Sequence, residues 1–136
     1  MDEWVPVDLI HLSDGRGDSL VLRAVERHED RRALVRAECL ITTDFMNARL
    51  KTHIWLDDLE EWEEALRRLG AGEDASWPHG GRGLSLYFHL HEDGSLSISV
   101  HDPDRLTVML GLEPTSEWID EHEANLQRLR DAYGES

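Results

Sequence analysis

A stretch of strict alternation constrains the fold of this chain more than any other feature. Met46, Ala48, Leu50, Thr52, Ile54 and Leu56 fall on one side of an extended chain, and four of the five residues between them are polar. A period of two over this length is typical of a strand with one buried face. At Asp57 the apolar residues change to spacings of three and four, which predicts an amphipathic helix over 57–70 that begins with a capping box of Asp57 and Glu60.

Similar patterns organise the rest of the chain. Alternation predicts strands at about 5–12, 19–28 and 33–42, a hairpin from 84 to 100 and a strand at about 105–111, and a last helix follows Ser116. Tight turns between successive strands favour antiparallel pairing. We therefore predict one α+β domain over residues 1–136. It consists of a mostly antiparallel sheet of about seven strands with two amphipathic helices packed on it, in the order of four strands, a helix, three strands and a helix.

The hairpin turn decides which residues of its strands face each other. A two-residue turn pairs Leu90 with Ser97 and mixes the two faces, whereas a three-residue loop over Asp93–Ser95 keeps apolar residues opposite each other. This loop pairs Leu90 with Ile98 and Phe88 with Val100, and it puts His101 opposite Tyr87. Gly94 is the residue expected in the left-handed conformation.

The charge of the chain excludes several classes of partner. Asp and Glu number 29 against 14 Lys and Arg, a formal net charge of −15. Such a chain repels nucleic-acid phosphates and anionic membranes and attracts cationic partners. Cys39 is the only cysteine, and the N-terminus has neither a basic nor an apolar leader segment, so we expect a cytoplasmic protein.

The candidate partner-binding residues are four acids and two tryptophans: Glu60, Glu61, Glu63, Glu64, Trp55 and Trp77. The acids share the predicted helix, although a run of charge is also what a solvated helix face looks like. Trp55 falls on the polar face of its strand, which indicates a binding surface or burial by the termini of the chain. Trp77 lies in a long loop, where we favour a plug at the edge of the core over a partner contact.

Three histidines form the candidate metal site. His89 and His91 project from one face of a strand, and His101 falls on that face in the expected hairpin. The alternative is a set of polar residues on the solvated face of a sheet, and we favour it. Cys39 is expected to be a buried, inert thiol and His122 a satisfied core histidine. No nucleophile elbow, phosphate loop or dinucleotide motif is present, so we expect neither an enzyme nor a cofactor.

Several segments together resemble a family of small, uncharacterised actinobacterial proteins that is known as a domain of unknown function. These segments are Asp8–Ile10, Leu12–Gly15, Leu59–Leu66, Trp77, Gly80–Arg82 and Trp118–Ile119. The resemblance implies an antiparallel sheet with helices, and it names no reaction. In size, charge and fold class the chain is also similar to WapI-type immunity proteins of bacterial toxin systems, by analogy alone.

These observations favour a non-enzymatic protein that binds a basic protein partner, such as an immunity-like inhibitor of a basic toxin. Two alternatives remain open from the sequence. One is a metal-binding protein or metalloenzyme built on His89, His91 and His101, and the other is a regulatory or scaffold domain.

Overall fold

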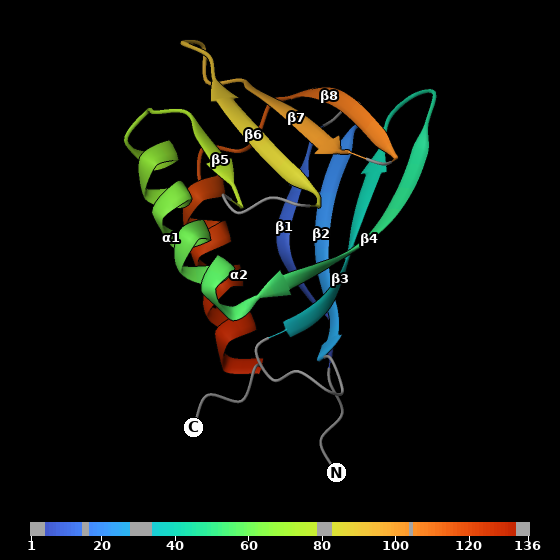
Figure 1. Cartoon of the computed structure of the whole chain (residues 1–136). Helices are drawn as coiled ribbons and strands as arrows, with labels where there is room; N and C mark the ends of the chain where they lie inside the picture. Colours follow the sequence, from blue (N-terminus) through green and yellow to red (C-terminus); the bar gives the residue numbers. More distant parts are fainter. Residues whose placement is uncertain (1–4, 15–16, 28–33, 79–82, 104, 133–136) are drawn as a thin grey trace.

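Eight strands and two helices make up the structure (Figure 1), a computed structural model that describes residues 5–14, 17–27, 34–78, 83–103 and 105–132. In chain order the elements are β1 (Val7–Ser13), β2 (Ser19–Arg27), β3 (Leu34–Thr42), β4 (Asn47–Trp55), α1 (Leu56–Gly70), β5 (Ala75–Trp77), β6 (Ser85–Leu90), β7 (Leu96–Asp102), β8 (Leu106–Leu112) and α2 (Trp118–Ala132). Neither helix combines the length and the apolar character that crossing a lipid bilayer requires, as far as the described residues go.

The strands form two four-stranded antiparallel sheets, β1-β2-β3-β4 and β5-β6-β7-β8. Antiparallel strands with two packed helices are therefore confirmed, whereas the predicted single sheet of about seven strands is wrong. The additional strand is β5, which at three residues is too short to show alternation and lies in a segment predicted to be a loop. The sheets separate where α1 carries the chain away from β4 before β5 begins.

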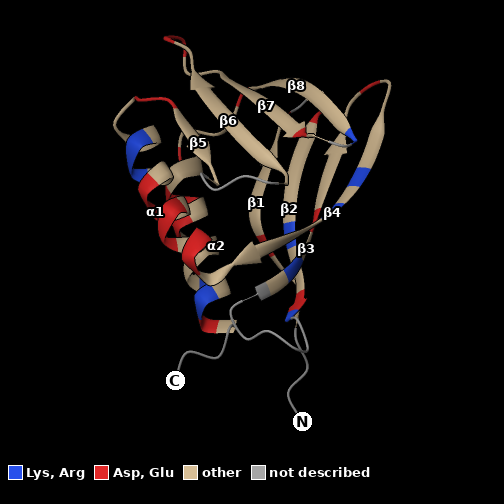
Figure 2. Cartoon of the chain, viewed as in Figure 1, with Lys and Arg blue, Asp and Glu red and all other residues tan. Residues whose placement is uncertain are grey.

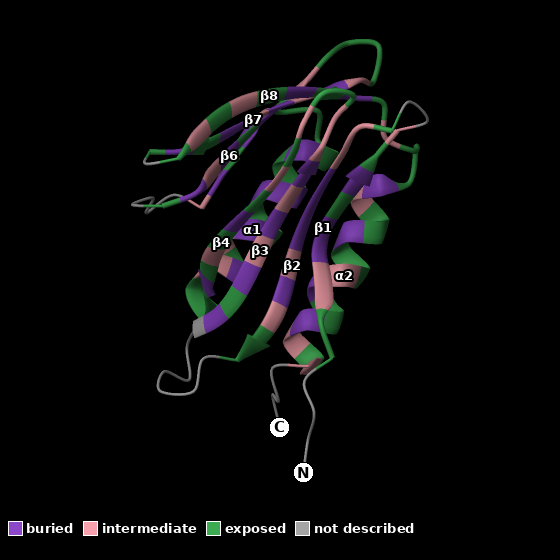
Figure 3. Cartoon of the chain, turned by 90° about the vertical axis from the view of Figure 1, so that its right-hand side faces the viewer, coloured by how far each residue is buried: buried purple, intermediate pink, exposed green. Residues whose placement is uncertain are grey.

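The two helices lie side by side against one face of the first sheet, and the second sheet lies across one end of this pair of layers (Figures 1 and 3). Helix α2 flanks β1, and α1 lies between α2 and β5. Buried side chains from both sheets and both helices join in one hydrophobic core. Along the strands buried and exposed residues alternate, as the sequence predicts (Figure 3).

Helix α1 begins earlier than the sequence predicts. Strand β4 runs directly into it, so Leu56 is already its first residue and Asp57 lies inside the first turn. The backbone N–H of Trp55 donates a hydrogen bond to Oδ2 of Asp58 at 2.9 Å. Asp58 therefore has the role predicted for Glu60, because no loop residue separates the strand from the helix.

The register of the β6–β7 hairpin differs by two residues from the prediction. Phe88 lies opposite Ile98, and Leu90 lies opposite Leu96. The backbone N–H of His91 donates to the carbonyl of Ser95 at 2.9 Å, which closes the loop one residue earlier than expected. The predicted left-handed Gly94 is confirmed, with φ of 90°. Since the shift is even, each residue keeps the face that the alternation assigns to it.

Trp62 of α1 is the junction at which the layers meet. Its side chain is fully buried, and its ring centroid lies 5.1 Å from that of Trp77, 5.5 Å from that of Phe88 and 6.5 Å from that of His122. These three neighbours belong to β5, β6 and α2. The indole N–H of Trp62 has no hydrogen-bond partner among the described residues. The contribution of this side chain therefore comes from packing, since aromatic rings in contact bury large apolar areas.

His122 ties α2 to the first sheet. It is 1% exposed, its Nδ1 donates to the carbonyl of Trp118 at 2.6 Å, and its Nε2 accepts the backbone N–H of His11 at 3.0 Å. This pattern fixes the neutral tautomer with hydrogen on Nδ1. Burial lowers the pKa of His122, against a weaker upward effect of the Trp118 carbonyl and Glu121. The predicted satisfied core histidine is confirmed.

The substitution Trp62→Ala should lower the free energy of unfolding by about 3–5 kcal/mol, because it leaves a cavity between three elements. Trp62→Phe should cost less, since it keeps a ring and breaks no hydrogen bond. Trp55→Ala, at a side chain that is 45% exposed, is the matched control and should change stability by less than about 1 kcal/mol. Chemical denaturation measures all three, and a loss of under about 1 kcal/mol for Trp62→Ala would contradict the junction.

His122 should make the fold sensitive to mild acid. Its pKa is lower in the folded chain than in the unfolded chain, so its contribution to stability is complete above about pH 6.5 and is lost as the pH falls below that value. The free energy of unfolding, measured between about pH 7.5 and pH 5, should fall more steeply for the wild type than for His122→Gln. Parallel curves for the two proteins would show that the His122 environment is wrong.

Candidate functional site

Acidic residues are concentrated on the two helices, which we call the helix wall (Figure 2). Within their bounds the helices contain ten acids and four arginines. The acids are Asp57, Asp58, Glu60, Glu61, Glu63, Glu64, Asp120, Glu121, Glu123 and Asp131, and the arginines are Arg67, Arg68, Arg128 and Arg130. A cationic partner therefore meets its strongest attraction on this side of the described chain.

The outer face of the first sheet carries charges that alternate in sign. Asp8 lies opposite Arg23, Arg23 opposite Glu38, and Glu38 opposite Lys51, so that one row crosses all four strands. Arg23 Nε donates to Asp8 Oδ1 at 2.7 Å. We call this row the charge ladder. Because each charge lies next to one of opposite sign, this face attracts an ionic partner less strongly than the helix wall does.

The second sheet is almost free of charge. Its four strands contain one charged residue, Asp102, which is buried and hydrogen-bonded to Arg105. The outward-facing residues of these strands are Ser76, Ser85, Tyr87, His89, Ser97, Ser99, His101, Thr107, Met109 and Gly111. The net charge is therefore unevenly distributed over the helices, the first sheet and the second sheet.

The four acids predicted to bind a partner all lie on α1, but they differ in surroundings. Glu60 is exposed and Glu61 is partly covered. Glu63 accepts a hydrogen bond from Arg130 of α2 at 2.9 Å, and Glu64 pairs with Arg67 one turn along the helix. Pairing at exposed positions stabilises the fold little. Two of the four candidate carboxylates, those of Glu63 and Glu64, already have an arginine partner.

The two candidate tryptophans have opposite positions. Trp55 is 45% exposed at the start of α1, next to the acids of the first turn. Trp77 is 2% exposed, and its Nε1–H donates to the carbonyl of Asp58 at 2.7 Å. Trp77 as a partner contact is therefore wrong, and the favoured alternative, a plug at the core edge, is correct. Cys39 is also buried, as predicted, and burial raises the pKa of its thiol to about 12.

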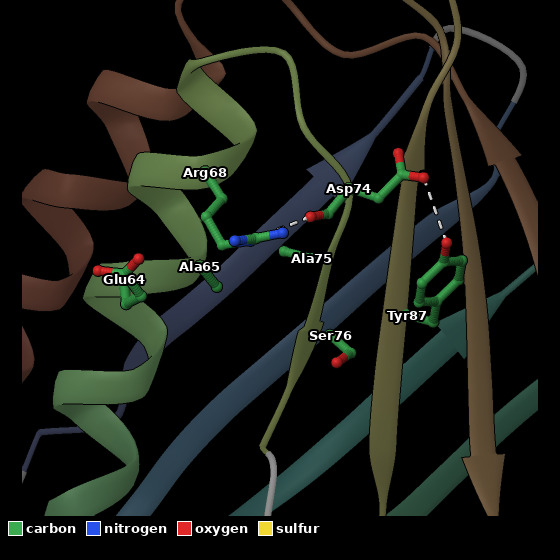
Figure 4. A pocket seen from close by; sticks show the side chains of 7 residues that line it. All are labelled: Glu64, Ala65, Arg68, Asp74, Ala75, Ser76 and Tyr87. Carbon is green, nitrogen blue, oxygen red and sulfur yellow. Dashed lines mark hydrogen bonds between the residues drawn. The ribbon is translucent and has the colours of Figure 1, made fainter.

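A groove of about 440 Å³ lies between α1 and β5 (Figure 4). It is lined by Glu64, Ala65, Arg68, Asp74, Ala75, Ser76 and Tyr87. Arg68 reaches across it from α1, and its Nε donates to the backbone carbonyl of Asp74 at 3.3 Å. The groove thus joins the helix wall to the nearly uncharged second sheet.

Asp74 is the hydrogen-bonding centre of this groove. Its carboxylate accepts from Tyr87 Oη at 3.2 Å, His89 Nδ1 at 2.9 Å and the backbone N–H of Leu90 at 3.1 Å. The bond from His89, followed by that from Leu90, lowers the pKa of Asp74, and Asp74 in turn raises the pKa of Tyr87. An ionised carboxylate, a phenol and a guanidinium form a set that binds through hydrogen bonds and charge.

Sequence reasoning missed the Asp74 centre. Asp74 precedes a strand too short to be recognised, and Arg68 is one of two arginines in the last turn of α1, where basic residues are common. One signal existed, because Tyr87 falls on the polar face of its strand, where its hydroxyl can reach a hydrogen-bond partner. The shifted register also changes its neighbour, which is Ser99 in place of the predicted His101.

Two of the three predicted metal ligands lie together. The ring centroids of His89 and His91 are 4.6 Å apart in an edge-to-face arrangement, and His91 Nε2 lies 2.7 Å from Ser97 Oγ. His101 belongs to a different row of the same face and is bonded to Thr107 at 2.8 Å. Within the part of the chain that the structure describes, no three metal-ligating side chains form a group that could hold an ion.

The model of a family of unknown function (DUF5959) matches residues 7–134. The chain belongs to this family. A comparison with curated proteins finds no match.

One solved structure, entitled "Structure of a guideRNA-binding protein complex bound to a gRNA", is similar to this member of the DUF5959 family, with a TM-score of 0.51 and 15% identity. The similarity covers 98% of this chain and 94% of the other. At this level of identity it shows a shared fold and nothing further.

The substitution Asp74→Asn tests the hydrogen-bonding centre of the groove. Because the carboxylate of Asp74 raises the pKa of Tyr87, removal of its charge should lower that pKa toward the ordinary value of about 10. Ultraviolet titration of the phenolate measures this change, and Tyr87→Phe assigns the signal, since the chain has two tyrosines. An unchanged Tyr87 titration in the Asp74→Asn variant would contradict the contact.

Proposed function

We propose that this chain is a non-enzymatic protein that binds a basic protein partner on its helix wall, as an immunity-like inhibitor of a basic toxin would. The uneven distribution of charge is the single observation that supports this proposal. The acids gather on α1 and α2, while the first sheet pairs its charges in the ladder and the second sheet has almost none. The net charge thus favours one docking side.

Trp55 is the proposed aromatic anchor of this interface. It is exposed where β4 passes into α1, so it adjoins the acidic first turn of that helix. Protein interfaces are often centred on an aromatic residue surrounded by polar groups that exclude water. Acids around a tryptophan combine rapid, charge-steered association with slow dissociation.

The likeness to WapI-type immunity proteins and an actinobacterial origin enter this proposal from the sequence resemblance alone. They suggest that the partner is a basic toxin whose gene lies next to the gene of this protein in an actinobacterium. A regulatory or scaffold domain in the cytoplasm is the outcome that remains if the captured partner is acidic.

Neutralising the helix wall should slow association with the captured partner. Glu60→Gln/Glu64→Gln should reduce the association rate about threefold or more, whereas Trp55→Ala should raise the dissociation rate about tenfold or more. The matched control is Asp44→Asn/Glu92→Gln, which removes two exposed acids outside the helices and reduces the negative charge of the chain by the same amount. Its association rate should stay close to that of the wild type.

Capture from lysate of the native host supplies the partner, and kinetics at increasing ionic strength supply the rates. The wild-type association rate should fall as salt rises, since screening weakens attraction between exposed charges. Equal effects of the helix-wall double variant and its control would show that overall charge, and not this wall, attracts the partner. An association rate that does not change with salt concentration would refute the electrostatic model.

Metal binding is a second candidate function. Two observations support it: the rings of His89 and His91 are adjacent, and the carboxylate of Asp74 is hydrogen-bonded to His89. Carboxylates orient metal-ligating histidines in this way. Calorimetric titration with Zn²⁺ tests it against the double variant His89→Gln/His91→Gln. Equal heats for the two proteins would remove this candidate.

A further inference from the structure

Strand β8 presents an unprotected sheet edge. It is the last strand of the second sheet and pairs only with β7 among the described strands. The other edges are protected, because α2 flanks β1, α1 flanks β5, and β4 carries Arg49 and Lys51. In contrast, the seven residues of β8 include neither a charge nor a proline. Natural sheets use such residues to prevent pairing with another chain.

The face beside this edge is also free of charge. One row crosses the second sheet from Ser76 through Tyr87 and Ser99 to Met109, and no member of the row is ionised at neutral pH. Met109 ends the row with 71% of its surface exposed. A partner that approaches β8 thus meets unpaired backbone groups flanked by an apolar side chain.

We propose that two copies of this chain pair through β8, antiparallel to each other about a twofold axis, so that one sheet continues across both molecules. A twofold axis at the centre of β8 places Met109 opposite its own copy and Thr107 opposite Gly111. On the inner face it places Val108 opposite Leu110. Every pair then joins residues of the same face, and no charges oppose each other.

The self-complementary register of β8 favours a second copy as the occupant, and the distribution of charge favours β8 as the place. Two molecules with a formal charge of −15 each repel one another, most strongly where their helix walls approach. Contact through β8 brings together the sheet that has one buried charge in its strands and keeps the acidic helices apart. This inference does not depend on the proposed binding of a basic partner.

Salt should strengthen this dimer. The Debye length falls from about 30 Å at 0.01 M to about 8 Å at 0.15 M ionic strength, which weakens the repulsion and leaves the β8 contacts unchanged. Sedimentation equilibrium of the purified protein should therefore show a dimer that tightens as salt rises, the opposite of the response proposed for the basic partner. A monomer at every concentration up to about 1 mM, or a dimer that salt weakens, would overturn the proposal.

Charge substitution locates the interface. Met109→Lys places two cations opposite each other at the axis and should weaken the dimer by about fivefold or more. Phe45→Lys is the matched control, since Phe45 is 83% exposed in the β3–β4 turn and the change in net charge is the same. It should leave the dimer intact. Thermal unfolding should confirm that both variants fold, and equal dimerisation of the two would overturn the proposal.

Disulfide formation tests the geometry without disturbing the strand. Opposite residues of antiparallel strands have Cα atoms about 4.5–5.5 Å apart, which a disulfide can span. Met109→Cys should therefore form a covalent dimer under mild oxidation, since the native Cys39 is buried and unreactive. Phe45→Cys at the same concentration should remain largely monomeric. Equal cross-linking of both variants would overturn the pairing.

Discussion

The packing around Trp62 joins four elements at one point of the core. Hydrogen bonds organise each sheet internally, but among the described strands neither sheet donates a ladder bond to the other. The indole ring of Trp62 lies against Trp77, Phe88 and His122, so it joins β5, β6 and α2 to α1. His122 continues the connection to β1 through the backbone of His11. Direct hydrogen bonds add to this packing, since Trp77 donates to the Asp58 carbonyl and Arg130 donates to Glu63.

The sequence predicts whatever depends on side-chain periodicity within a single element. The strands from β1 to β4, both helices, the buried Cys39 and the satisfied His122 belong to this class, because each follows from a repeat of two or 3.6 residues. Features that depend on pairing between elements could not be predicted from the sequence. The choice between one sheet and two, the β6–β7 register and the hydrogen bonds of Asp74 are set by contacts between segments, and periodicity carries no information on such contacts.

Total charge predicts an acidic surface without saying which elements carry it. The structure adds that this surface consists mainly of helices. The structure also distinguishes the two candidate tryptophans, since Trp55 is exposed beside the acids whereas Trp77 lies in the core. A tryptophan in a strand of known parity could be placed from the sequence. The burial of a tryptophan in a long loop depends on where the loop returns, and the sequence does not state this.

The charge ladder has a consequence for the specificity of folding. Alternation of buried and exposed residues forbids a strand to slip by one position, but it tolerates a slip by two. In the first sheet a two-residue slip in one direction brings Arg23 opposite Arg36, and the same slip of the next pair brings Arg36 opposite Lys51, so like charges oppose the error. The second sheet has no such check on its outer face. Its register depends on the fit of apolar side chains, on the turn at Gly94 and on neutral hydrogen bonds such as that between His91 and Ser97. The hairpin whose pairing could not be deduced from the sequence is thus the one whose register no row of paired charges enforces.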